Sequence, residues 1–74
     1  MFEAHIECWM YDADTADWLA TDPGWLAVQY DDAKDIAVAN GKTPTGAVSL
    51  KSYTLIGPLN DGLDYDFVYE VAVA

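Results

Sequence analysis

Residues 63–73 read LDYDFVYEVAV, and this stretch decides the fold because its side chains alternate in character along its length. Aromatic and aliphatic side chains occupy every second position, and acidic side chains hold several of the positions between them. A period of two is typical of a β-strand with one buried face and one face toward solvent. The predicted buried face comprises Tyr65, Phe67, Tyr69, Val71 and Val73, and the opposite face comprises Asp64, Asp66, Val68, Glu70 and Ala72.

The N-terminal residues 2–11 show the same alternation and predict a second strand with one buried face. Together the two stretches predict a sheet with one apolar face and one acidic face. In residues 2–11 the buried face comprises Phe2, Ala4, Ile6, Cys8 and Met10, and the other face comprises Glu3, His5, Glu7, Trp9 and Tyr11.

Turn and capping signals divide the remaining chain. Residues 47–56 are rich in Val, Leu, Tyr, Thr and Ile, which favours a strand, and residues 57–62 hold the Gly, Pro, Asn and Asp of a hairpin loop. We expect residues 43–46 to form a loop and residues 12–20 to form one or two helical turns. Asp12 or Asp14 is the candidate N-cap of that short helix.

Residues 25–41 allow two interpretations. Asp22 as N-cap with Pro23 at the first helical position would start one long helix. The alternation over residues 25–30 instead favours a strand, followed by a helix over residues 32–40 that ends before Gly41. We prefer the second interpretation.

The predicted fold is a single compact α+β domain over residues 1–74. It has a four-stranded, mostly antiparallel sheet with one main helix packed on one face, in the order β-(short α)-β-α-β-β. Because the helix covers the apolar face, the acidic face is expected to lie in solvent.

The charge is strongly one-sided. Asp and Glu number 13 against 3 Lys and Arg, none of them arginine, so the formal net charge is −10 in 74 residues. With 3 Trp, 5 Tyr and 2 Phe the chain is too aromatic for a disordered acidic tail. A folded surface of this sign suits a basic partner, and it disfavours direct binding to nucleic acid or to an anionic membrane. The single Cys8 excludes an internal disulfide and fits a reducing cytoplasm.

No pattern of residues predicts catalysis, a metal or a cofactor. Cys8 and His5 lie on opposite faces of one predicted strand, so they cannot easily form a nucleophile and base. Glu3, His5 and Glu7 share a face and could in principle chelate a metal. The acidic run over residues 12–17 lacks the Gly and Glu that a calcium loop requires at its sixth and twelfth positions. We therefore expect a protein that is not an enzyme.

In size, charge and compact α+β build, the whole chain resembles the small acidic proteins that bacteriophages and plasmids make against host defences. These include DNA-mimic antirestriction proteins and several anti-CRISPR proteins. The resemblance implies an inhibitor that occupies a basic nucleic-acid-binding surface of a host complex in the host cytoplasm. The alternative is a generic acidic interaction module, antitoxin-like or an assembly partner, without mimicry. The candidate partner-binding residues are Glu3, Glu7, Trp9, Tyr11, Asp12, Asp14, Asp17, Asp64, Asp66 and Glu70.

Self-repulsion at a net charge of −10 lowers the stability of the folded chain. We expect the melting temperature to rise when salt is increased to about 0.15 M, where the Debye length is ≈ 8 Å. It should also rise on mild acidification toward the isoelectric point of about 4.1. Differential scanning calorimetry at low and moderate ionic strength measures both effects. Coincident melting temperatures at the two salt concentrations would contradict the prediction.

Overall fold

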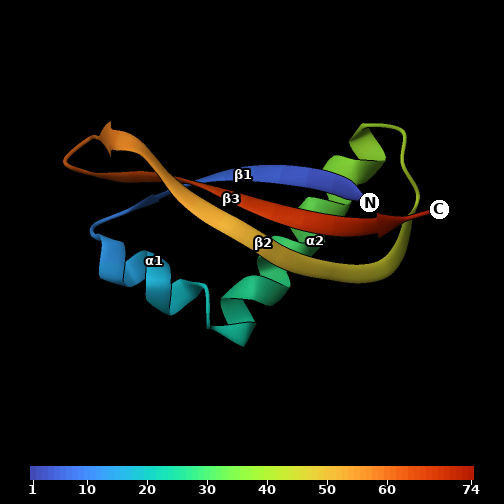
Figure 1. The fold of residues 1–74 in the computed structure, drawn as a ribbon, viewed down its shortest axis with the longest axis horizontal. Coiled ribbons are helices and arrows are strands. Elements are labelled where there is room, and N and C mark those ends of the chain that lie inside the picture. The colour runs from blue at the N-terminus through green and yellow to red at the C-terminus, as the bar shows by residue number, and fades with distance from the viewer.

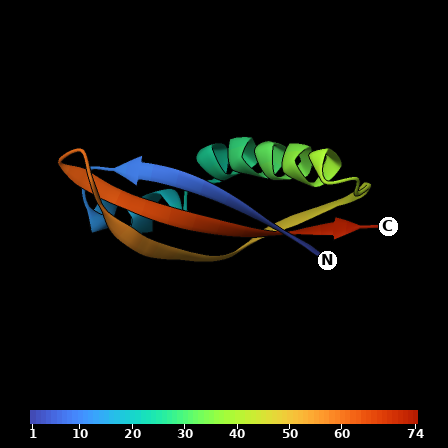
Figure 2. The ribbon, with the colours of Figure 1, turned by 90° about the horizontal axis from the view of Figure 1, so that it is seen from above.

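The computed structural model describes all of residues 1–74 and contains three strands and two helices. The elements are β1 (Phe2–Met10), α1 (Ala13–Leu19), α2 (Pro23–Ala39), β2 (Pro44–Leu59) and β3 (Gly62–Val73). The strands form one antiparallel sheet in the order β1-β3-β2, so β3 is central (Figure 1). Helix α2 crosses one face of the sheet (Figure 2). Helix α1 lies beside β2, in the half of the molecule that holds the turn between β2 and β3 (Figure 1).

The α+β class fits this structure, but the predicted four-stranded sheet and its order β-(short α)-β-α-β-β are wrong. The predicted strand at residues 25–30 belongs to α2, which starts with Pro23 at its first position, as the alternative interpretation required. Residues 25–30 are helical because the side chains that face the sheet are spaced by four residues, as on one side of a helix. These side chains are Trp25, Gln29, Ala33 and Ala37, whereas Val28, which the predicted strand would have placed with Leu26, is 59% exposed.

The other element boundaries also move. Residues 12–20 contain the expected short helix, and residues 2–11 and 63–73 contain the expected strands. Strand β2 is longer than the predicted residues 47–56, and it includes Pro44–Gly46 and Gly57–Leu59, which we expected to be loops. Register shifts against β3, among them those between Leu50 and Ser52 and between Leu55 and Gly57, let this long strand follow its neighbour.

Aromatic contacts hold α2 against β3. The ring of Trp25 meets Phe67 edge-on at 5.1 Å between centroids, and Tyr30 meets Tyr69 at 5.7 Å. These are favoured edge-to-face arrangements. The fully buried Ala33 and Ala37, further along the same helix, leave room for it to approach the sheet closely.

The predicted alternation in β1 and β3 is confirmed. Phe67, Tyr69 and Val71 are fully buried, and Ile6 and Cys8 are partly buried against them. The antiparallel register places these side chains on one face of the sheet, toward α2. The acidic side chains of both strands therefore share the opposite face.

Helix α2 ends in a hydrogen-bonded cap. Gly41 has a φ of 78°, and its N–H donates to the Val38 carbonyl at 2.9 Å while the Lys42 N–H donates to the Ala37 carbonyl at 3.0 Å. This is the Schellman pattern, in which glycine adopts the left-handed conformation at low cost. The expectation that Gly41 follows the helix is confirmed.

A tight hairpin joins β2 and β3. Leu59 pairs with Gly62, and the two residues between them, Asn60 and Asp61, have φ values of 52° and 62°. This is the geometry of a type I′ turn, which suits the twist of the flanking strands. The Trp9 indole lies against Gly62, where a methyl carbon added to the glycine would come within 2.3 Å of the ring.

Replacing Gly62 by alanine should therefore destabilise the protein. The new methyl group must displace the Trp9 ring, and overpacking of this kind costs about 1–3 kcal/mol. The matched control is Gly24→Ala, because nothing lies within 4 Å of its added carbon. Urea unfolding measures both variants. Equal stabilities for the two variants would show that the Trp9 ring moves away without cost.

Candidate functional site

The face of the sheet opposite α2 gathers most of the predicted binding residues, and we call it the acidic face. Across the strands, Glu3 pairs with Glu70, Glu7 with Asp66, and Trp9 with Asp64. Neighbouring strands lie about 4.8 Å apart, and alternate residues along a strand lie about 6.8 Å apart. The register thus places carboxylates side by side on a stiff surface. The acidic face comprises Glu3, His5, Glu7 and Trp9 of β1, Asp64, Asp66, Val68 and Glu70 of β3, and Ser49, Ser52 and Thr54 of β2.

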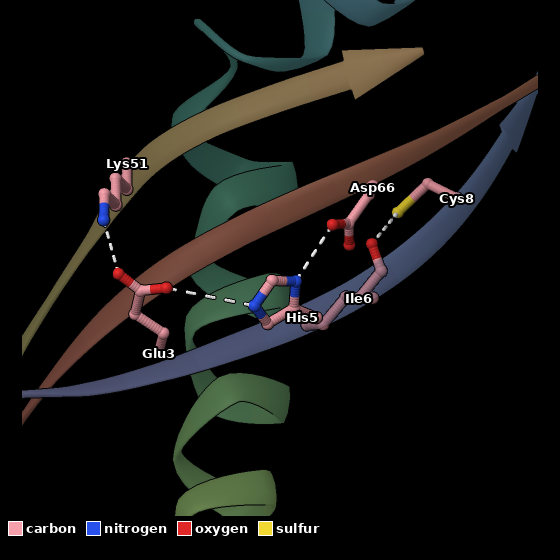
Figure 3. A network of polar contacts seen from close by, with 6 residues as sticks. All are labelled: Glu3, His5, Ile6, Cys8, Lys51 and Asp66. Atoms are coloured by element: carbon pink, nitrogen blue, oxygen red, sulfur yellow. Dashed lines mark hydrogen bonds and ion pairs between the residues drawn. The ribbon is translucent and has the colours of Figure 1, made fainter. Parts of the chain in front are cut away.

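An ion pair between Lys51 and Glu3 and two contacts of the His5 ring with carboxylates occupy one half of the acidic face, as Figure 3 shows. The Lys51 ammonium donates to a Glu3 carboxylate oxygen. His5 Nδ1 lies 2.9 Å from Asp66 Oδ2, and His5 Nε2 lies 3.9 Å from Glu3 Oε1. The pair with Lys51 lowers the pKa of Glu3, and Glu3 in turn raises the pKa of Lys51.

Glu7 and Asp64 lie in the other half and have no cationic partner. The ion pairs of the chain involve Glu3, Asp66, His5 and Lys51 but neither of these two carboxylates. Asp64 raises the pKa of Glu7, first through a side-chain hydrogen bond and then through charge repulsion, with smaller contributions from burial and Asp66. Ionisation of Glu7 is therefore less favourable in the folded protein than in the unfolded chain.

The expectation that Asp64 points freely into solvent is wrong. Asp64 is only 9% exposed, and Asp66 and Glu70 are partly exposed. The reason is the central position of β3, because strands flank these side chains on both sides. Glu3 and Glu7, which lie on the edge strand β1, are exposed as predicted.

Trp9 and Tyr11 form an exposed aromatic pair at the hairpin end of the acidic face. Their rings meet edge-on with centroids 4.7 Å apart, and the residues are 41% and 79% exposed. The Trp9 indole N–H donates to the Leu59 carbonyl at 2.5 Å. Trp9 thus fixes the hairpin to β1 while part of its ring remains accessible.

The acidic residues of α1 lie outside the acidic face. Asp12 is the helix N-cap, since its Oδ1 accepts hydrogen bonds from the N–H and hydroxyl of Thr15, both at 2.8 Å, and these bonds lower its pKa. Asp17 accepts a hydrogen bond from the Tyr53 hydroxyl at 2.9 Å. Asp14 is exposed in the first helical turn. Structural roles thus account for Asp12 and Asp17.

Cys8 lies beneath the sheet, against α2. Its thiol is 3.8 Å from Gln29 Oε1, which also accepts a hydrogen bond from the buried Tyr69 hydroxyl at 3.0 Å. Burial, followed by the charges of Asp64, Asp66 and Glu7, raises the pKa of Cys8 to about 11. The thiol is therefore protonated at neutral pH and is a poor nucleophile.

No group of three or more His, Cys, Asp or Glu side chains is arranged to hold a metal ion. Neither helix is long and apolar enough to cross a membrane. Comparison with known protein families, with curated proteins and with solved structures found no match.

Sequence reasoning missed the contacts that Lys51 and His5 make with carboxylates of the acidic face. Lys51 reaches Glu3 because the register shift between Leu50 and Ser52 leaves it without a partner on β3. His5 meets Asp66 because the two residues lie on adjacent strands, His5 opposite Val68 and Asp66 opposite Glu7. No local pattern in the sequence signals either the register or the bulge.

Replacing either glutamate of β1 by glutamine should change the melting temperature, upward for Glu7 and downward for Glu3. The pKa of Glu7 is raised above its ordinary value of 4.5, so its ionisation removes stability as the pH rises through the folded-state pKa. Glu7→Gln should raise the melting temperature at pH 7, and the gain should vanish well below pH 4.5, where Glu7 is protonated in both states.

Glu3→Gln is the matched control from the same strand and face. The lowered pKa of Glu3 means that it contributes stability above 4.5, which is lost as the pH falls through the folded-state pKa. The variant should melt at a lower temperature at pH 7, with a difference that shrinks on acidification. Shifts of the same sign for both variants would contradict this account of the acidic face.

Proposed function

We propose that this protein is a non-enzymatic inhibitor of a host nucleic-acid-binding defence complex, acting as an acidic nucleic-acid mimic of the anti-CRISPR or antirestriction type. The observation that carries the proposal is the acidic face, where β1 and β3 align carboxylates in register on one uncovered side of the sheet. A basic partner in the host cytoplasm would supply the missing cations.

The length of the acidic face supports the proposal. From Glu3 to Trp9 it runs along six residue steps of β1, about 20 Å, or a little over half a turn of B-DNA. Duplex DNA carries one charge per ~1.7 Å of axis, counting both strands, so the acidic face copies part of that field rather than its full density. A fixed negative surface of this kind attracts a phosphate-binding channel and speeds association with it.

The arrangement of cations also supports it. Of the lysines, Lys51 reaches the acidic face, while Lys34 lies on α2 and Lys42 follows that helix. No lysine reaches Glu7 or Asp64, and Asp64 raises the pKa of Glu7 through a side-chain hydrogen bond and charge repulsion. Such a local conflict is expected where a surface is shaped by binding rather than by stability.

The test is competition with nucleic acid for the target. The chain is first used to capture complexes from a bacterial lysate, and the retained nuclease or surveillance complex is then purified and loaded with labelled DNA. We expect the chain to displace the DNA, with an affinity that falls steeply as salt rises. Double reversal Glu7→Lys with Glu70→Lys should weaken displacement by roughly tenfold or more, because it places positive charges against a positive site.

The matched control reverses Asp31 and Asp35, which are exposed on α2 and give the same change in net charge. This variant should displace DNA nearly as well as the wild type. Equal losses in the two variants would mean that net charge, rather than the acidic face, drives binding. A partner without a nucleic-acid site would favour the generic interaction module instead.

A further inference from the structure

The hairpin end of the acidic face holds an aromatic pair, and the fold fixes the orientation of the Trp9 ring. The hydrogen bond from the Trp9 indole to the Leu59 carbonyl and the close approach to Gly62 hold the Trp9 ring in one orientation. Tyr11 packs edge-on against it and makes no side-chain hydrogen bond that would explain its position. Most of the Tyr11 ring is exposed to solvent.

Two carboxylates without cations border this pair. Asp64 lies directly opposite Trp9 in the register, and Glu7 lies two residues before Trp9 on the same face of β1. Asp64 is more than nine-tenths buried and takes part in none of the ion pairs of the chain, and its side-chain contact with Glu7 is with another acid. A buried charge is normally paired with a charge of the opposite sign.

We propose that Trp9, Tyr11, Glu7 and Asp64 form a site for an arginine side chain of a basic protein partner. This inference rests on the proposed function, because it names the residue type through which the partner would engage the acidic face. The guanidinium group would lie against the exposed aromatic rings and donate hydrogen bonds to Glu7 and Asp64.

Arginine fits this site better than lysine for geometric reasons. The guanidinium is planar, stacks on aromatic rings, and presents several N–H donors that match carboxylates in pairs. It is also more weakly hydrated than an ammonium group, so it loses less on entering a partly buried site. Cation–π attraction to the Trp9 and Tyr11 rings adds to the attraction between the guanidinium and the two carboxylates.

The chain cannot fill the site itself. It contains no arginine, and its closest lysine on the acidic face, Lys51, is engaged with Glu3. A second copy of the chain would likewise bring no guanidinium and would add another negative surface. The occupant is therefore a different, basic protein.

The test uses two probes, a nine-residue oligoarginine and a nine-residue oligolysine, titrated into the full chain by calorimetry at low salt. The ratio of the two dissociation constants isolates the guanidinium from the charge that both peptides share. In the wild type, oligoarginine should bind at least about threefold more tightly, in line with an exposed cation–π contact. In Tyr11→Ala the ratio should fall toward one.

The matched control is Trp18→Leu, which removes a 63% exposed tryptophan from the acidic helix α1. This variant should keep the wild-type ratio. Trp9→Leu is a second test but also weakens the hairpin, so Tyr11→Ala, whose side chain makes no hydrogen bond, is the primary one. Circular dichroism checks that each variant is folded.

Three results would overturn the site. If both peptides bind but the ratio is the same in the wild type and in Tyr11→Ala, the aromatic pair is not involved, and the proposed function still stands on charge. If neither peptide binds at low salt, the arginine site and the proposed function both fail. If sedimentation shows self-association that Tyr11→Ala abolishes, the aromatic pair is an interface between copies of the chain.

Discussion

The central strand β3 is the constraint on which the rest of the structure depends. Its pleat sends Phe67 and Tyr69 into the core beneath α2 and, by the same alternation, sends Asp66 and Glu70 to the opposite face. The stability of the fold and the charge of the acidic face are therefore two consequences of one strand. A shift of its register by one residue would bury the acids and expose the aromatic core.

The two halves of the acidic face differ in their partners. Lys51 pairs with Glu3 and His5 contacts Asp66, so that end of the sheet resembles an ordinary surface, where ion pairs contribute little to stability. At the hairpin end, Glu7 and Asp64 face each other beside Trp9. A small domain has little stability to spare, so two carboxylates that face each other without a cation are a cost to the fold.

The strands at the two ends of the chain could be predicted because a period of two is visible within ten residues. Residues 25–30 could not, because Leu26, Val28 and Tyr30 alternate as in a strand while Trp25 and Gln29 also fit a helical stripe. The ambiguity is resolved by packing. Ala33 and Ala37 extend the stripe and allow one long helix to lie close against β3, which a strand followed by a short helix would not match.

The sequence by itself determined which side chains share a face, since alternation is a local property of each strand. It also determined the sign of the surface, the end of α2 at Gly41 and the opposite faces of Cys8 and His5, while it left the N-cap of α1 open between Asp12 and Asp14. Tertiary structure alone decided the number of strands, the burial of Asp64 and the pairing of Glu3 with Lys51. These features depend on which strand is central and on the β2 bulges, and both are set by contacts between residues far apart in the chain.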